Sequence, residues 1–482
     1  MLKIENLDKN ISKIFELESF GYEPEKIIID IPSITEPDIP FTIKIALIDR
    51  NEYPSFKFDE IIVLKSEELN IEIPVKFKKN RPAIAFIKNF LINYEGFFKF
   101  YCEFNGKVFY SNPSLSRKNN TYKIFWGDPH VHTVLSDCHP DIAKSVHFAI
   151  NYGNFVSFLN WISITDHISN RRSTLGKWKE GIYVSKFYNK EGEFIILPGY
   201  EASLKSFNGG DNNVYFTNYP DIFVDEFEQG NIKTLCKKLK EKSKIQNFDF
   251  FVVPHHTSRA QKHGEINEDI YPGQIYMPAI EIHSKWGTSE YYGNPDSLIE
   301  PYNGEGYAVD YLKKGFYVGF IGGSDTHKTM PANNEKETSH LIYQSGLTAV
   351  FNDFLNIKNL FESIRNRKTY ATKGEKIFLE VKVNNILSGT IFDLDKKDKV
   401  KISVISASPY LIKNIEIIRN GEIIYQKNLN NWYDKTDYVD EVNFKNDYLE
   451  SETFGKFVFY YVRVNTSSNS CAWSSPVFIK LN

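Results

Sequence analysis

The sequence contains few cysteines and no long apolar run. Only four cysteines occur among 482 residues, and they show neither a CxxC spacing nor any regular spacing. This pattern excludes a disulfide scaffold or a zinc ribbon as the basis of the fold and favours a reducing compartment. No stretch reaches the roughly 18 apolar residues that a membrane-spanning helix needs. Residues 1–20 mix charged and apolar side chains, unlike a signal peptide, so we expect a soluble, cytoplasmic protein.

The charge balance is close to neutral. The chain has 58 Lys and Arg against 61 Asp and Glu, which gives a formal net charge of −3. Such a balance indicates neither a nucleic-acid partner nor a membrane surface. Repeats of the solenoid type and low-complexity tracts are also missing.

The chain divides into three regions by its pattern of apolar runs. Residues 1–120 and 375–482 are rich in short β-type runs, and Asn-Gly pairs at 105–106 and 420–421 predict tight hairpin turns. We expect a β-sandwich in each of these two regions. In residues 121–374 short apolar runs alternate with helical patterns, which predicts a parallel sheet or barrel. The predicted architecture is therefore a central α/β domain between two β-sandwich domains.

The stretch WGDPHVHT contains two histidines one residue apart. In an extended segment, side chains at positions i and i+2 point to the same side, so His130 and His132 converge on one point. Two imidazoles at one point suggest a metal ion, although this spacing alone is weak evidence.

Further potential ligands follow the apolar runs of the middle region in a regular way. Six successive runs end in His, Asp or Glu, at His130 and His132, Asp166 and His167, Glu201, His255 and His256, His283, and Asp325 and His327. In a parallel barrel all carboxyl ends of the strands meet at one rim. We therefore expect these side chains to form a metal site. Cys138 is expected to be a buried spectator, and the role of His139 is left open.

With these motifs in this order, the sequence resembles the PHP (polymerase and histidinol phosphatase) superfamily of metallohydrolases, in particular a large branch of unknown function. The matching motifs are GDPHVHT, ITDH, LPGYE, PHH, EIHSKWGTSE and GGSDTHKTMPA. The resemblance spans about residues 126–479 and implies a distorted (β/α)7 barrel, a TIM-like fold, that carries two or three divalent ions.

The resemblance also implies the ligands of these ions. They would be His130, His132, His167, Glu201, His255, His283, Asp325 and His327, with Asp137 as the ninth. Two positions stay open: His256 could replace His255, and some relatives use a histidine at the position of Cys138 instead of Asp137. Mixed imidazole and carboxylate ligands suit zinc, manganese or iron.

The predicted activity is that of a metal-dependent hydrolase, with Glu201, Asp325 and His327 as catalytic residues. Basic residues follow several of the ligand motifs, namely Arg171, Arg172, Arg259, Lys285 and Lys328. As a set they favour a small anionic substrate, and hydrolysis of a metabolite or saccharide phosphate is the leading expectation. The alternatives are an amidohydrolase-like enzyme that cleaves a C–N or C–O bond, and a metal-binding module without catalysis.

Overall fold

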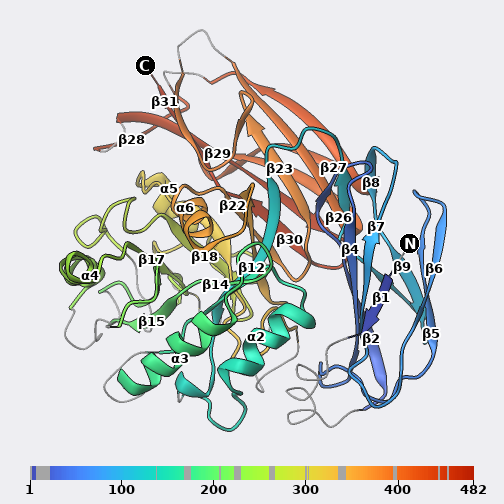
Figure 1. Ribbon diagram of the computed structural model, residues 1–482. Coiled ribbons are helices and arrows are strands. Elements are labelled where there is room, and N and C mark those ends of the chain that lie inside the picture. Colours follow the sequence, from blue (N-terminus) through green and yellow to red (C-terminus); the bar gives the residue numbers. More distant parts are fainter. Residues whose placement is uncertain are drawn as a thin grey trace.

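The chain folds into three regions that follow one another along the sequence. Figure 1 shows the amino-terminal strands on the right, the carboxy-terminal sheet at the top and the middle region at the lower left. The computed structural model describes residues 3–6, 22–136, 138–167, 175–205, 208–221, 230–259, 266–298, 301, 303–334, 343–394, 399–442, 446–452 and 455–481. Strands account for 46% and helices for 14%, so the structure is mostly β.

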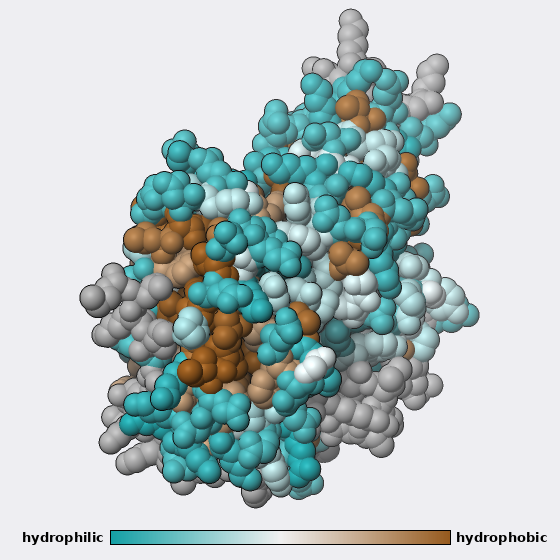
Figure 2. Space-filling view, turned by 90° about the vertical axis from the view of Figure 1, so that its right-hand side faces the viewer, coloured by the Kyte–Doolittle hydropathy of each residue, from teal (hydrophilic) through white to brown (hydrophobic). Residues whose placement is uncertain are grey.

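The amino-terminal region contains two antiparallel four-stranded sheets around a common core. One sheet has the order β1 (Lys3–Asn6), β7 (Ile84–Phe90), β4 (Phe41–Asp49) and β2 (Pro24–Asp30); the other has β10 (Lys107–Tyr110), β9 (Tyr101–Phe104), β5 (Ile61–Ser66) and β6 (Ile71–Lys76). Alternating apolar residues such as Ile43, Ile45 and Leu64 are fully buried between the sheets. A short third sheet joins β3 (Ile34–Thr35), β11 (Ser114–Ser116) and β8 (Gly96–Phe98). Figure 2, which looks onto this side of the molecule, shows a largely hydrophilic surface with a large apolar area and smaller apolar areas elsewhere.

The carboxy-terminal region is built around two long paired strands. They are β26 (Val400–Arg419) and β27 (Glu422–Asp440). The other strands are β23 (Phe378–Val383), β24 (Ile386–Leu387), β25 (Ile391–Leu394), β28 (Leu449–Ser451), β29 (Gly455–Thr466), β30 (Cys471–Ser474) and β31 (Val477–Leu481). Asn420 has a φ of 53° in the turn between β26 and β27, and Asn105 has a φ of 50° between β9 and β10. Both predicted Asn-Gly hairpin turns are thereby confirmed.

The middle region combines short strands with the helices. Its strands are β12 (Lys123–Val131), β13 (Trp161–Ile164), β14 (Ile195–Ile196), β15 (Gly199–Ser203), β16 (Asp211–Phe216), β17 (Phe250–Pro254), β18 (Ala279–Ser284), β19 (Gly287–Thr288), β20 (Gly319–Gly322), β21 (Gly346–Asn352) and β22 (Thr369–Lys373). Its helices are α2 (Val146–Phe155), α3 (Leu175–Tyr188), α4 (Ile232–Gln246), α5 (Ala308–Lys313) and α6 (Ile357–Arg365), with a 3₁₀ turn, η1 (Val134–Ser136). Side-chain oxygens of Ser145, Asn231 and Asn356 cap α2, α4 and α6, which explains where these helices begin.

The prediction of a (β/α)7, TIM-like barrel is wrong. Such a barrel needs parallel neighbours throughout, with a helix after each strand. Parallel pairing joins β12 to β13, β13 to β14 and β18 to β20, but β16 runs antiparallel between β15 and β17, and β21 runs antiparallel to β12. Five helices in the described residues are also too few. One local reason is the pair Gly209 and Gly210, whose φ values of 109° and 57° return the chain as a hairpin where a helical crossover was expected.

The middle and carboxy-terminal regions share one sheet. Its order is β14-β13-β12-β21-β22-β30-β29-β26-β23-β24. The two regions are joined where β22 of the middle region pairs with β30 of the carboxy-terminal region. On the other side, Phe148 and Tyr152 of α2 pack against Ala46 and Ile48 of β4 in a common apolar cluster. The middle region is therefore held between the two β regions. The domain boundaries at 120 and 374 remain predictions.

Candidate metal centre

Segments from several strand ends meet in the middle region even though no barrel forms. The amide of Asp325 donates to the carbonyl of His130 at 2.9 Å, so the loop after β20 runs beside the end of β12. A parallel bridge joins His167, just after β13, to Glu201 in β15. These backbone contacts place the side chains of the four residues around one buried point. Residues at strand ends therefore meet as the sequence predicted, but the sheets that bring them together are not those of a parallel barrel.

Glu201 lies among four imidazoles. Its Oε2 atom lies 3.2 Å from Nε2 of His132 and 3.3 Å from Nε2 of His130. Its Oε1 atom lies 3.3 Å from Nε2 of His255 and 3.4 Å from Nδ1 of His167. The carboxylate is 2% exposed, so these ring nitrogens replace water as its partners. A carboxylate with both oxygens surrounded in this way can bridge two cations.

Asp325 occupies the other side of the cluster. Its Oδ1 atom lies 3.1 Å from Nε2 of His132 and 3.7 Å from Nδ1 of His327, and its Oδ2 atom lies 3.3 Å from Nε2 of His256. Both Asp325 and His256 have a φ of 52°, the left-handed conformation that non-glycine residues rarely adopt. Such backbone strain is concentrated at functional sites, where surrounding structure enforces it. His255 contacts Glu201 and His256 contacts Asp325, so the structure brings both histidines to the cluster and the choice between them as ligand stays open.

The donor atoms form three overlapping groups, each with all its donor atoms within 4.8 Å of one another. The groups are His130, His132 and Asp325; His130, Glu201 and His255; and His132, Cys138, His167 and His327. The nitrogen and oxygen donors of the first two groups match the ligands of zinc, manganese and iron. Cys138, expected to be a spectator, belongs to the third group. His139 lies at the edge of the cluster, where its ring contacts that of His327 at 4.4 Å between centroids.

Without cations, burial and neighbouring charges act in opposite directions on the ionisable groups of the cluster. Burial opposes ionisation of Asp325, but the neighbouring imidazoles, His130 foremost, hold the pKa of its carboxyl well below its usual range. Burial likewise opposes protonation of His130, but the charges of Asp325 and Glu281 raise the pKa of its imidazole well above its usual range. The ionised carboxylates are thus stabilised by positive charge nearby, which either protons on imidazoles or divalent cations can supply.

His283 does not join the cluster, and Glu281 takes its place. Nδ1 of His283 lies 2.8 Å from Oγ1 of Thr288, its Nε2 lies 2.8 Å from the carbonyl oxygen of Gln344, and its ring stacks on Trp473. A bulge between Glu281 and His283 interrupts the pairing of β18 with β20 and breaks the alternation of sides. Glu281 instead contacts Nδ1 of the buried His130 at 3.1 Å. Burial lowers the pKa of His283 to about 4, as expected for a neutral structural histidine.

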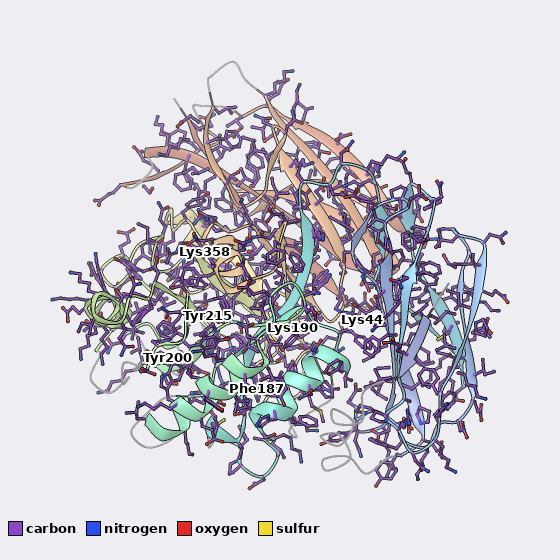
Figure 3. The ribbon with its side chains drawn as sticks, viewed as in Figure 1. Lys44, Phe187, Lys190, Tyr200, Tyr215 and Lys358 are labelled. Atoms are coloured by element: carbon purple, nitrogen blue, oxygen red, sulfur yellow. The ribbon has the colours of Figure 1, made fainter. Side chains whose placement is uncertain are left out.

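Two further residues hold the backbone next to the cluster in place by hydrogen bonds. The carboxylate of Asp128 accepts hydrogen bonds from the backbone amides of His130, Ser324 and Ala332, and it thereby ties the HxH segment to the loop after β20. Tyr215 of β16, labelled in Figure 3, donates to the carbonyl of Pro129 at 2.9 Å. An acidic residue two positions before the first histidine was the only sequence signal for this support.

Gly323 leaves room where the segments cross. A Cβ atom there would lie 2.5 Å from Oε2 of Glu281 and 2.7 Å from Cβ of His130. Any side chain would therefore push apart β12 and β18. The Gly-Gly pair before SDTH is explained by this close approach.

The predicted substrate residues have different outcomes. Arg259 lies just after β17, where its amide donates to the carbonyl of His256 at 3.0 Å, and its buried Nε–H has no partner within the described structure. Lys285 is buried in the turn between β18 and β19. Asp137, Arg171 and Arg172 lie outside the described residues, so their predicted roles stay predictions.

Comparisons with known proteins leave the function open. No family model matches the chain. An uncharacterized protein of Chlamydia pneumoniae is 25% identical over 97% of this chain and 76% of its own length, and one of Chlamydia trachomatis serovar D is 24% identical over the same shares.

Solved structures give equally little guidance. A cycloisomaltooligosaccharide glucanotransferase of Paenibacillus sp. aligns with 94% of this chain and 72% of its own, at 8% identity and a TM-score of 0.26. A β-glucuronidase of Bacteroides uniformis covers 94% and 60%, at 8% identity and a TM-score of 0.17. Likenesses this weak support no statement on fold or activity. The mostly β architecture also conflicts with the PHP description, which is corrected together with the barrel.

In the described part of the chain, no helix is both long and apolar enough to cross a membrane.

Proposed function

We propose that this protein is a metal-dependent hydrolase that uses two or three divalent ions, of zinc, manganese or iron. The observation that carries the proposal is that the buried carboxylates of Glu201 and Asp325 lie among six histidines from four separate segments. These histidines are His130, His132, His167, His255, His256 and His327. Histidines and carboxylates rarely concentrate in a protein interior unless they bind metal or substrate.

The donor set fits such ions. The carboxylates are held in their ionised form in a site of low exposure. All three donor groups contain histidines, whose imidazoles can lose a proton and bind a metal ion. Glu281 contacts Nδ1 of His130, so it can fix the ring with Nε2 toward Glu201. This arrangement of a ligand and its carboxylate partner is typical of metal sites. When bound, the ions would supply Lewis acidity and lower the pKa of a coordinated water.

The residues of the chain supply positioning and charge. Glu201 has imidazoles around both of its carboxylate oxygens and would be a ligand of the bound ions. Asp325 presents its carboxylate on the side of His256, where it can accept a hydrogen bond from the attacking water and fix its direction. His327 lies beside Asp325 and sets its position. The three catalytic assignments made from the sequence are retained in this sense.

We further propose a phosphate ester of a small metabolite or saccharide as substrate. Phosphoryl transfer needs cations around the non-bridging oxygens. Arg259 follows the ligand pair His255 and His256 and has a buried donor for such an oxygen. A place in the cytoplasm is proposed as well, because all four cysteines are free thiols.

Metal-loaded protein should be assayed against phosphomonoesters, phosphodiesters, lactones and amides, with the bound metal measured in parallel. Asp325→Asn should abolish turnover without loss of fold, whereas His147→Ala, on the exposed side of α2, should leave turnover unchanged. Hydrolysis of lactones or amides alone would favour the amidohydrolase-like alternative. Bound metal with no hydrolysis of any substrate would favour a non-catalytic module, and absence of bound metal would refute the metal centre.

A further inference from the structure

A cysteine lies at the outer edge of the histidine cluster. The Sγ atom of Cys138 and donor nitrogens of His132, His167 and His327 all lie within 4.8 Å of one another. Cys138 and His167 are partly exposed, whereas Glu201 and its other neighbours His130, His132 and His255 are buried. Within the described residues, the other three cysteines belong to no such group. The chain thus places one sulfur donor on the solvent side of a nitrogen-rich cluster.

We propose that Cys138 is a thiolate ligand in a separate, outer metal site that selects a zinc-class ion. Its other ligands are His167 and His327, which occur in no other donor group, together with His132, which is shared with the inner cluster. The site therefore differs in kind from the inner groups, which combine imidazoles with the carboxylates of Glu201 and Asp325. Thiolate donors favour zinc and disfavour magnesium, calcium and manganese.

The spacing suits tetrahedral coordination. Bonds of roughly 2.0–2.1 Å to nitrogen and about 2.3 Å to sulfur place tetrahedral ligand atoms roughly 3.3–3.8 Å apart. A small contraction of the four donors satisfies this requirement. Where the inner site takes Nε2 of His132, which lies 3.1 Å from Oδ1 of Asp325, three outer ligands remain. A zinc ion with three protein ligands keeps an open position for water or substrate.

Ser136 links the ligands of the outer site. Its Oγ atom lies 3.2 Å from Sγ of Cys138 and 3.4 Å from Nδ1 of His132, and it accepts a hydrogen bond from the amide of His167 at 3.1 Å. One hydroxyl in η1 therefore organises three of the four ligand residues. A thiol that merely filled space would need no such shared partner.

The simpler interpretation is that the Cys138 thiol donates to Ser136 and binds nothing else. The two interpretations differ in a spectroscopic signature. Cobalt(II) bound to a thiolate shows an intense sulfur-to-metal charge-transfer absorption in the near ultraviolet, which nitrogen and oxygen ligands do not produce. The experiment is to titrate metal-free full-length protein with cobalt(II) alone and to record this band together with the number of ions bound.

Wild-type protein should show the band, and Cys138→Ser should lose it together with one bound ion. Cys236→Ser is the matched control, because Cys236 is buried in α4 within a separate apolar cluster, and it should keep both. Cys138→His should keep the ion and lose the band, which separates loss of the thiolate from loss of fold. A band that persists in Cys138→Ser, a wild-type protein that holds cobalt without the band, or one that holds no cobalt would each overturn the proposal.

The outer site rests on the proposed metal binding of the cluster and does not rest on hydrolysis. The band without hydrolysis of any ester would support the thiolate site while the hydrolase proposal fell. Hydrolysis in a cobalt-loaded protein without the band would support the hydrolase and refute Cys138 as a ligand. The two failures are therefore distinguishable.

Discussion

Oε2 of Glu281 lies 3.1 Å from Nδ1 of His130, and both side chains are fully enclosed in the protein. This contact determines which nitrogen of His130 can face Glu201 and a metal ion. Ligand imidazoles usually have such a partner, and its removal typically weakens metal binding about 10- to 100-fold. Glu281 therefore belongs to the proposed metal centre although it need not touch an ion.

Glu281→Gln should lower metal affinity by about 10- to 100-fold, because a neutral amide holds the His130 ring less firmly. Competition of the protein with a chromophoric chelator measures the change. Glu380→Gln is the control. Glu380 is another buried glutamate; it lies in β23, outside the cluster, and pairs with Arg117 and Tyr122. Equal affinities of wild type and Glu281→Gln would remove Glu281 from the site.

His283→Gln should leave the bound metal unchanged, whereas His255→Gln should lose metal, because His255 contacts Glu201 and His283 does not join the cluster. Elemental analysis of the two variants tests this contrast. Loss of metal from His283→Gln would return His283 to the ligand set that the sequence predicted.

His283 should also make the fold sensitive to acid. Its folded-state pKa of about 4 lies below the unfolded value near 6.5, so its stabilising contribution is complete above pH ~6.5 and is lost as the pH falls toward 4. The loss should be on the order of 3 kcal/mol for so buried a ring. Urea unfolding of wild type and His283→Gln across this window should show a shallower pH dependence in the variant.

Metal binding should release protons at neutral pH. The raised pKa values of His130 and His132 mean that these rings carry protons in the metal-free protein, and a ligand imidazole must be neutral. Apparent metal affinity should therefore rise with pH. Calorimetric titrations in two buffers of different ionisation enthalpy give the number of protons released, and the double variant His130→Ala, His132→Ala should release fewer.

The same groups set the stability of the metal-free protein. The raised pKa of His130 gives stability that is complete below pH ~6.5 and is lost as the pH rises through the folded value. The lowered pKa of Asp325 gives stability that is present above pH ~4 and is lost as the pH falls through its folded value. The apo cluster should therefore be most stabilising between these limits, and a metal-free protein whose stability does not fall at pH values well above and well below this range would contradict the ion pairs.

Local sequence patterns predicted the residues of the cluster better than the fold around it. His130, His132, Glu201 and Asp325 were found because each follows a short apolar run, and that feature depends on neighbouring residues only. The direction of a strand has no such local signature. The return of the chain at Gly209 and Gly210 therefore went unrecognised, and with it the antiparallel pairing that rules out a barrel.

The exchange of His283 for Glu281 shows the same limit at the level of one side chain. Strict alternation along β18 places both residues on one face, and only the bulge in its pairing with β20 separates them. A bulge forms between two strands that are distant in sequence, so neither strand alone reveals it. The grouping of Cys138 with His132, His167 and His327 likewise has no signature in the sequence, because these residues come from separate segments or turns.

Arg259 should bind an anionic group of the substrate. Its Nε–H is buried and has no partner in the described part of the chain, and Arg259 follows the proposed ligands His255 and His256. A guanidinium can hold two phosphate oxygens in one plane, whereas an ammonium acts as a point charge. Arg259→Lys should therefore lower kcat/KM for phosphate esters roughly 5- to 150-fold, which corresponds to a loss of about 1–3 kcal/mol of transition-state stabilisation.

Turnover of an uncharged ester should change little in Arg259→Lys, because that substrate offers no group for the guanidinium. Parallel kinetics of wild type and Arg259→Lys with a phosphate ester and a neutral ester, at equal metal content, measure the difference. An equal loss with both substrates would indicate that Arg259 supports the loop after β17 and not the substrate. Unchanged turnover of both would leave Arg171 and Arg172 as the remaining predicted anion-binding residues.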